Sequence, residues 1–127
     1  MGLLYEELSY VLRGMFFKIY NEIGPGFKEE IYVRALLKLL DDKKIPYQRE
    51  KQFNINFKNA KIGTTKVDLV IDNKIIIEAK ATEINNSIFE KQVISYLKST
   101  GLSLGFLVNF GTSKLFIKRY INSKQSA

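Results

Sequence analysis

The chain has 127 residues, a length typical of a single domain, and 46% of them are hydrophobic, enough to form a buried core. It contains no cysteine and no histidine. Disulfide frameworks, zinc sites built on thiolate or imidazole, and Ser-His-Asp or Cys-His catalysis are therefore excluded. The 20 Lys and Arg residues outnumber the 13 Asp and Glu residues and give a net charge of +7, which favours a polyanionic partner, nucleic acid first.

The first part of the chain carries apolar residues at helical spacing. The pattern predicts a helix from about Leu3 to Glu22, which Gly24-Pro25-Gly26 would end. A second helix is predicted from about Lys28 to Asp42, and Pro46 marks the exit from it.

Three strands are predicted next. Alternating apolar residues indicate a strand from Tyr47 to Phe57, followed by a turn at Lys58-Asn59-Ala60. The second strand begins near Ile62 and runs to Ile71, and the third covers Lys74 to Ala81. The residues between them, Asp72-Asn73, tolerate left-handed backbone and favour a hairpin.

The last third of the chain predicts one helix and two strands. The helix begins near Ser87, with Ser87 and Glu90 placed as a capping box, and Gly101 is a good stop for it. A buried strand is predicted at Leu104–Phe110 and a final strand at Leu115–Tyr120. The order is thus helix, helix, three strands, helix, two strands.

This order predicts an α/β fold. The segment that contains the third helix is long enough to be a crossover between parallel strands, so the sheet should be mixed, with helices on both faces. Residues 1–121 are expected to form one domain, and residues 122–127 a polar, frayed tail. No signal peptide and no membrane-spanning stretch is apparent, which predicts an intracellular, cytoplasmic protein with no membrane partner.

Three charged residues interrupt the second and third predicted strands: Asp68, Glu78 and Lys80. Burying a charge is costly unless it is paired or binds a metal. Glu78 and Lys80 share one face because side chains alternate along a strand. Asp68 joins them only if the hairpin has an odd loop or a bulge. A loop of Ile71-Asp72-Asn73 would pair Asp68 with Ile76, diagonal to Glu78.

Two carboxylates near one point can bind Mg²⁺ or Mn²⁺ through oxygen ligands. A lysine beside them can hold a water or stabilise charge on a phosphate. The set therefore suits hydrolysis of a phosphodiester by metal-activated water. Taken alone, Glu78-x-Lys80 also fits a same-face ion pair at the end of a strand. Asp68 on the neighbouring strand favours a functional site over such an ion pair.

Ordered motifs outside these strands carry a family resemblance: Gly26–Tyr32, which fits G-x-x-E-x-x-Y; Gln92–Gly101; and Gly105–Gly111. With Asp68 and Glu78-Ala79-Lys80 between them, the chain resembles the GxxExxY family of the PD-(D/E)XK nuclease-like superfamily. The resemblance covers about residues 15 to 120 and implies a restriction-endonuclease-like core.

The resemblance implies a role for each matching residue. Asp68 and Glu78 would be paired metal ligands, Lys80 the catalytic lysine, and Ala79 a source of a backbone carbonyl ligand. Glu29 matches the acid on the helix before the sheet, which approaches the metal site in related nucleases.

The third helix carries a second part of the resemblance. Gln92 and Tyr96 match a Q-x-x-x-Y element and share one helix face because they are one turn apart. Gln92 is thereby included among the candidate catalytic residues. Members of the family often carry a histidine three positions before this glutamine, where this chain has Phe89.

The sequence therefore predicts a Mg²⁺-dependent endo- or exonuclease, with Mn²⁺ as a substitute metal and DNA favoured over RNA as substrate. Its small size favours a structure-selective enzyme, a homodimer or one subunit of a larger system. The alternative is a nucleic-acid-binding or protein-interaction module with an inactive nuclease site.

Overall fold

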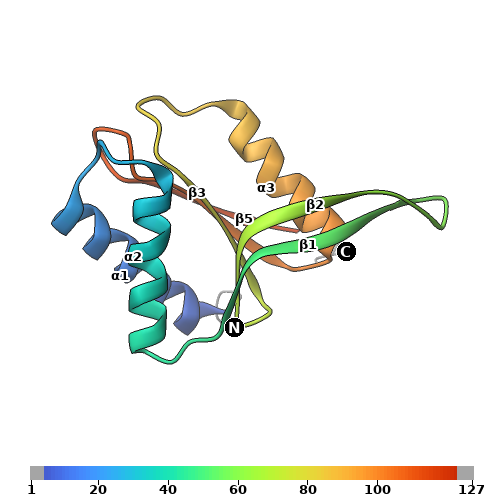
Figure 1. Ribbon diagram of the computed structural model, residues 1–127, viewed down its shortest axis with the longest axis horizontal. Coiled ribbons are helices and arrows are strands. Elements are labelled where there is room, and N and C mark those ends of the chain that lie inside the picture. Colours follow the sequence, from blue (N-terminus) through green and yellow to red (C-terminus); the bar gives the residue numbers. More distant parts are fainter. Residues whose placement is uncertain (1–4, 123–127) are drawn as a thin grey trace.

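A computed structural model describes residues 5–122 of the chain (Figure 1). Its helices and strands follow the predicted order and confirm the α/β class: α1 Glu6–Ile23, α2 Glu29–Asp42, β1 Tyr47–Phe57, β2 Ala60–Ile71, β3 Ile75–Lys80, α3 Ser87–Thr100, β4 Leu104–Asn109 and β5 Phe116–Ile121. The expected helix residues Leu3 and Leu4, and tail residues 123–127, lie outside the described part.

The five strands form one mixed sheet in the order β1-β2-β3-β4-β5. Strands β3 and β4 are parallel, and the other neighbouring pairs are antiparallel. Helix α3 supplies the crossover between the two parallel strands, as the length of its segment predicts. Figure 1 shows α1 and α2 on one side of the sheet and α3 on the other.

Each face of the sheet has its own apolar cluster. Residues of α1 and α2, among them Phe16 and Leu36, pack with Ile77 and Phe106 on one face. On the other face Val93 of α3 packs against apolar residues of β2, β3 and β4. Because β3 and β4 are covered on both faces, their sequences are nearly continuous apolar runs, as expected for central strands. Within residues 5–122, no helix combines the length and the apolar character needed to cross a membrane.

The hairpin between β2 and β3 has the odd loop that a shared carboxylate site requires. Ile71 pairs with Ile75, so the loop is Asp72-Asn73-Lys74, one residue longer than the predicted Asp72-Asn73 turn and one residue later than the odd loop Ile71-Asp72-Asn73 considered for a shared site. The loop begins one residue later because Asp72 and Asn73 both take left-handed backbone, with φ of 51° and 55°. The shift of one residue changes the partner expected for Asp68 from Ile76 to Glu78.

The start of α3 differs from the predicted capping box. Asn86 is the N-cap, and its side chain accepts a hydrogen bond from the Ile88 backbone N at 3.0 Å. Glu90 instead accepts hydrogen bonds from Lys118 at 2.8 Å and from the Tyr120 hydroxyl at 2.7 Å. These partners lie on β5, far along the chain, so a local pattern could not predict them. Gly101 ends the helix as predicted, with φ of 74°.

Asn122 was expected to begin the frayed tail, but it is buried. Its side chain donates to the carbonyls of Leu97 and Leu102, at 2.9 and 3.1 Å, and its backbone N donates to Ser103 at 2.9 Å. The residue thereby ties the end of β5 to the end of α3.

Strands β1 and β2 extend beyond the rest of the sheet as a two-stranded arm, defined here as residues 51–67. Pairing between β1 and β2 continues from Tyr47–Ile71 out to Phe57–Ala60, whereas β3 pairs with β2 only at residues 69–71. Figure 1 shows the arm projecting away from the body of the molecule.

Candidate nuclease site

The carboxylates of Asp68 and Glu78 meet where β2 and β3 cease to pair. The last ladder pair is Leu69–Ile77. One position further on, the Asp68 backbone N donates to Glu78 Oε1 at 3.4 Å, and the Ala79 backbone N donates to Asp68 Oδ2 at 3.3 Å. The two side chains thus stand where ladder hydrogen bonds would otherwise form.

The same contact orients the backbone of Ala79. The N–H and C=O of one strand residue point to the same side of the strand, because in an antiparallel ladder a residue exchanges both bonds with one partner. The Ala79 N–H points to Asp68, so its carbonyl is directed to that side too. The next residue alternates, and the Lys80 carbonyl accepts from Phe110 N on the β4 side at 2.8 Å.

The Lys80 ammonium is fixed beside the two carboxylates. Its Nζ lies 3.5 Å from Glu78 Oε2, and its side chain is only 16% exposed. Nζ also lies 4.8 Å from the centre of the Phe89 ring, within the range of a cation–π contact. Phe89, at the position where the resembled family often has histidine, therefore helps to hold this lysine.

The electrostatics of the two carboxylates favour an added positive charge. Burial, followed by the charge of Asp68, raises the pKa of Glu78 to about 8 despite the opposing effect of Lys80. Burial also raises the pKa of Asp68, against the Ala79 N–H and the Lys80 charge. Lys80 alone does not neutralise the pair, so a proton or a cation must offset the remaining charge.

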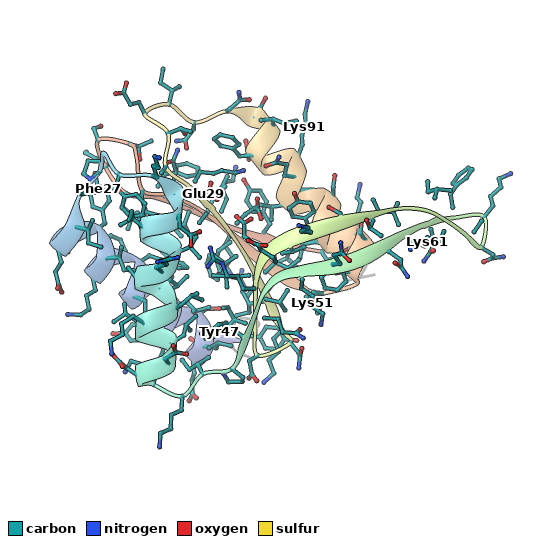
Figure 2. The ribbon with its side chains drawn as sticks, viewed as in Figure 1. Phe27, Glu29, Tyr47, Lys51, Lys61 and Lys91 are labelled. Carbon is teal, nitrogen blue, oxygen red and sulfur yellow. The ribbon has the colours of Figure 1, made fainter. Side chains whose placement is uncertain are left out.

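Glu29 lies at the N-terminal end of α2 (Figure 2), and the charges of the site affect its pKa although it makes no direct contact with Asp68 or Lys80. Its pKa is raised, first by loss of hydration and then by the charge of Asp68, while Lys80 lowers it. In residues 5–122 its carboxylate has no hydrogen-bond or ion-pair partner. The neighbouring Glu30, by contrast, is bound by Arg34 at 2.9 Å and by Arg49, so Glu29 is the acid left available to the site.

The G-x-x-E-x-x-Y motif has a structural explanation in the loop before α2. Gly26 has φ of 113°, which side chains rarely allow. The Tyr32 hydroxyl donates to the Gly24 carbonyl at 2.7 Å and accepts from Phe27 N at 3.1 Å, and the buried ring stacks on Phe110 at 4.8 Å. The glycine and the tyrosine fix the loop that places Glu29, and Tyr32 is a packing residue with a bonded hydroxyl.

Helix α3 brings Gln92 and Tyr96 to the same side of the sheet as Glu78. The pKa of Tyr96 is raised by burial and then by the charges of Glu78 and Asp68, so its hydroxyl lies near both acids. Gln92 lies on the helix between Phe89 and Tyr96. Its Oε1 is buried and has no hydrogen-bond partner in the described chain, so it is an acceptor whose partner the described residues do not supply.

Glu50 is a site neighbour that sequence reasoning missed. In the β1–β2 ladder, Arg49 pairs with Leu69 and Lys51 pairs with Val67. Glu50 and Asp68 lie between these two pairs but do not pair with each other. Glu50 takes left-handed backbone, with φ of 52°, and its charge contributes to the raised pKa of Asp68. A non-glycine residue with this backbone inside a strand has no sequence signal, although functional sites often contain such conformations.

Asn109 shapes the loop that follows Lys80 and was also missed. Its fully buried side chain accepts from the backbone N of Thr82 and of Gly111, at 3.1 and 3.0 Å. It donates to the Thr82 hydroxyl and to Asn85 Oδ1, at 3.0 and 2.9 Å. A Cβ at Gly111 would lie 2.5 Å from the Ala81 backbone. The Asn109-Phe110-Gly111 run therefore fixes the end of β3.

The donor set of this site fits a divalent cation that binds with few protein ligands. No group of three or more Asp and Glu side chains in residues 5–122 forms a ready-made metal cage. Mg²⁺, however, is usually held by one or two carboxylates, together with waters and substrate phosphates. Asp68, Glu78 and the Ala79 carbonyl supply such a set, with Glu29 across from it.

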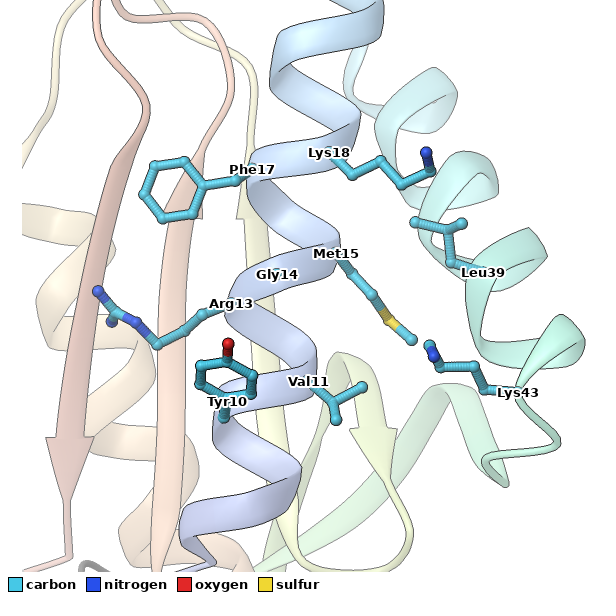
Figure 3. Close-up of a pocket in the computed structure, with 9 residues that line it drawn as sticks. All are labelled: Tyr10, Val11, Arg13, Gly14, Met15, Phe17, Lys18, Leu39 and Lys43. Atoms are coloured by element: carbon cyan, nitrogen blue, oxygen red, sulfur yellow. The ribbon is translucent and has the colours of Figure 1, made fainter.

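A sizeable cavity lies elsewhere, along α1 and beside the end of α2. It measures about 690 Å³ and is lined by apolar groups such as Met15 and Leu39, with Arg13 and Lys43 at its rim (Figure 3). No carboxylate lines it. This cavity therefore lacks the acidic groups of the candidate site at Asp68 and Glu78.

Comparison with known proteins agrees with this geometry. The family model for the PD-(D/E)XK nuclease superfamily matches residues 6–120. No curated protein matches the sequence. The crystal structure of SSO0001 shares the fold, with a TM-score of 0.57 and 20% identity, over 74% of this chain and 50% of that one. This chain thus spans half the length of that protein, and the likeness concerns the fold alone. The fold of this chain is consistent with a restriction-endonuclease-like core. On the family match, the chain belongs to the PD-(D/E)XK nuclease superfamily.

Proposed function

We propose that the chain is a metal-dependent nuclease that hydrolyses phosphodiester bonds, with Mg²⁺ as its metal and Mn²⁺ able to replace it. Membership of the superfamily indicates nuclease activity on nucleic acid. The observation that carries the proposal to these residues is the contact of Asp68 with Glu78, with the Lys80 ammonium 3.5 Å from Glu78.

Each residue has a distinct task in this proposal. Asp68, Glu78 and the Ala79 carbonyl hold the cation, and Glu29 approaches from α2. A bound divalent cation supplies Lewis-acid chemistry toward a phosphate and lowers the pKa of water. The Lys80 ammonium orients a water and stabilises the charge that develops on the phosphate, for which Phe89 holds it in place. Gln92 offers its free acceptor to the water or to the nucleic acid.

DNA is the proposed substrate, in preference to RNA, and the net charge of +7 supports a polyanionic partner. The G-x-x-E-x-x-Y loop and the Q-x-x-x-Y pair support assignment to the GxxExxY group within the superfamily. An intracellular location fits the absence of cysteine. The chain is proposed to act as an endo- or exonuclease, either as a homodimer or as one subunit of a larger system.

A metal titration followed by heat denaturation tests the proposal most simply. A cation that binds only the folded state raises the melting temperature in a concentration-dependent way. We expect a rise with Mg²⁺ and Mn²⁺ and cleavage of DNA in their presence. The alternative, a binding module with an inactive site, predicts no thermal shift and no cleavage of single-stranded, duplex or branched DNA.

A further inference from the structure

The β1–β2 arm is basic along its whole length. Residues 51–67 contain four lysines, Lys51, Lys58, Lys61 and Lys66, and no Asp or Glu. Several surface lysines outside the arm are paired with acids, as in Lys18–Glu22, Lys38–Asp42 and Lys118–Glu90. Figure 2 shows Lys51 toward the base of the arm and Lys61 near its tip.

The arm lysines have no acidic partner in the described chain. No ion pair involves any of the four, and Lys51 and Lys58 lie instead over the rings of Phe53 and Phe57, at 5.3 and 5.9 Å. A hairpin kept only for solubility would gain from a mixture of charges, because like charges along one strand pair repel. An unbalanced row of ammonium groups is suited to an external polyanion.

The two faces of the arm differ in character. Phe53, with its cross-strand partner Thr65, lies on the face toward α3, and Phe53 packs against the α3-side core. The opposite face consists of the cross-strand pairs Gln52–Lys66, Asn54–Thr64 and Asn56–Lys61, and all six residues are exposed. This outer face thus combines amides, which can hydrogen-bond base edges, with lysines, which can contact phosphates or guanine.

We propose that the arm enters the major groove of a B-form DNA duplex and holds it against the carboxylate site. The inference rests on the proposed nuclease function for the choice of ligand and names the surface that would bind it. The major groove of B-DNA accepts a two-stranded β-ribbon, whereas the deep, narrow groove of A-form RNA excludes side chains. The arm therefore gives a shape-based reason for DNA over RNA.

The position of the arm links groove binding to cleavage. Strand β2 runs from the arm directly into Asp68. The seven residue-to-residue steps from Lys61 to Asp68 span about 23 Å at roughly 3.3 Å each, which corresponds to about seven base pairs at 3.4 Å each. At the tip, Phe57 and Ile62 are 61% and 65% exposed and are suited to apolar contact with thymine methyl groups.

The first experiment measures the salt dependence of duplex binding by the triple variant K58Q/K61Q/K66Q. Metal is left out so that no cleavage occurs. Each lost phosphate contact reduces the slope of log K against log salt by about 0.9, so we expect a reduction of about 3 and a large loss of affinity at low salt. A slope and affinity equal to those of the parent would overturn the proposal.

The matched control removes the same number of charges from the body of the protein: K18Q/K38Q/K43Q. Two of these lysines form exposed ion pairs of little energetic value, so both triple variants should melt close to the parent. We expect the control to bind with a slope near that of the parent. An equal loss in both variants would mean that net charge alone binds DNA, and it would overturn the role of the arm.

The absence of cysteine permits a direct test of the groove. Thr64→Cys on the exposed outer face creates a single thiol, and Ser113→Cys in the exposed β4–β5 loop is the control. The duplex carries a tether that ends in an activated mixed disulfide, on C5 of thymine in the major groove or on N2 of guanine in the minor groove, so that the cysteine thiolate cross-links by exchange and releases the leaving thiol. We expect the arm cysteine to form a disulfide several-fold faster with the major-groove tether. A preference for the minor groove, or equal cross-linking of the control, would contradict the proposal.

Failure of the arm and failure of the nuclease function are distinguishable. If the parent cleaves DNA with Mg²⁺ while the arm variant keeps its affinity and salt slope, only the arm proposal is wrong. If arm-dependent DNA binding is found but neither Mg²⁺ nor Mn²⁺ supports cleavage, the arm proposal holds and the nuclease function is wrong.

Discussion

Asp68 and Glu78 face each other across the first position at which β2 and β3 no longer pair. The Glu78 carboxylate accepts a hydrogen bond from the Asp68 backbone N, and the Asp68 carboxylate accepts one from the Ala79 backbone N. Their charges repel in a site with little water, yet they are held together by the hairpin register. Two carboxylates in this position lower stability unless a charge compensates them, and the proposed cation would supply that charge.

The first prediction concerns Glu78→Gln in metal-free buffer. The pKa of Glu78 is about 8 in the folded protein and starts from 4.5. Between these values the folded state holds the proton more tightly than the unfolded state, so the free energy of unfolding falls as pH rises from about 4.5 to 8. The glutamine removes this loss, on the order of a few kcal/mol, and the variant should melt several degrees above the parent at pH 8.5 but not at pH 4.

Thermal melts across this pH range in EDTA check the effect. Asp42→Asn is the control, because Asp42 forms an exposed surface pair and loses the same charge. A parent whose melting temperature rises steadily from pH 4.5 to 8, in parallel with Glu78→Gln, would contradict the assignment of a raised pKa.

The second prediction separates metal binding from chemistry at Lys80. Lys80→Ala removes the ammonium beside Glu78 but leaves both carboxylates. Loss of one such electrostatic group typically costs about 10²–10³ in rate, while Mg²⁺ affinity should stay the same or rise, because a repelling cation is gone. Calorimetric titration and single-turnover cleavage measure the two effects. Phe89→Leu removes only the ring beneath Nζ and should give a smaller loss of rate.

The third prediction addresses the loop that places Glu29. Tyr32→Phe keeps the stacked ring and removes the hydroxyl that bonds Gly24 and Phe27. Leaving those backbone groups unpaired should lower the free energy of unfolding by about 1–3 kcal/mol, as measured by urea denaturation. If the loop positions only Glu29, the cleavage rate of Tyr32→Phe should fall no further than that of Glu29→Gln. A larger fall would mean that the loop also positions other groups. Tyr10→Phe, at an 80% exposed position, should change neither quantity.

Much of the fold followed from sequence because its signals are local. Apolar alternation gave β1 from Tyr47 to Phe57, and Gly101 marked the end of α3. The sequence placed the hairpin turn at Asp72-Asn73 and required an odd loop or a bulge only if Asp68 and Glu78 share a face; the structure has the three-residue loop Asp72-Asn73-Lys74.

What the sequence could not predict depends on distant partners. Glu30 has a local partner in Arg34, four residues later on α2, but its second partner, Arg49 on β1, is distant in sequence and could not be predicted. Glu90 fits a capping box, but Lys118 and Tyr120 bind it. The left-handed backbone of Glu50 is set by strand pairing around it rather than by its own preference.

The central claim is that Asp68 and Glu78 hold the divalent cation on which cleavage depends, and Asp68→Asn tests it most directly. The substitution keeps the shape of the side chain and removes one charge, and Asp72→Asn makes the same change at the exposed hairpin turn four residues later. Calorimetric Mg²⁺ titration and cleavage of duplex DNA are measured on both variants and on the parent. The account predicts that Asp68→Asn loses at least about tenfold in Mg²⁺ affinity and nearly all cleavage, while Asp72→Asn matches the parent and metal-free DNA binding survives in both. Cleavage and Mg²⁺ affinity in Asp68→Asn equal to those of the parent would contradict it.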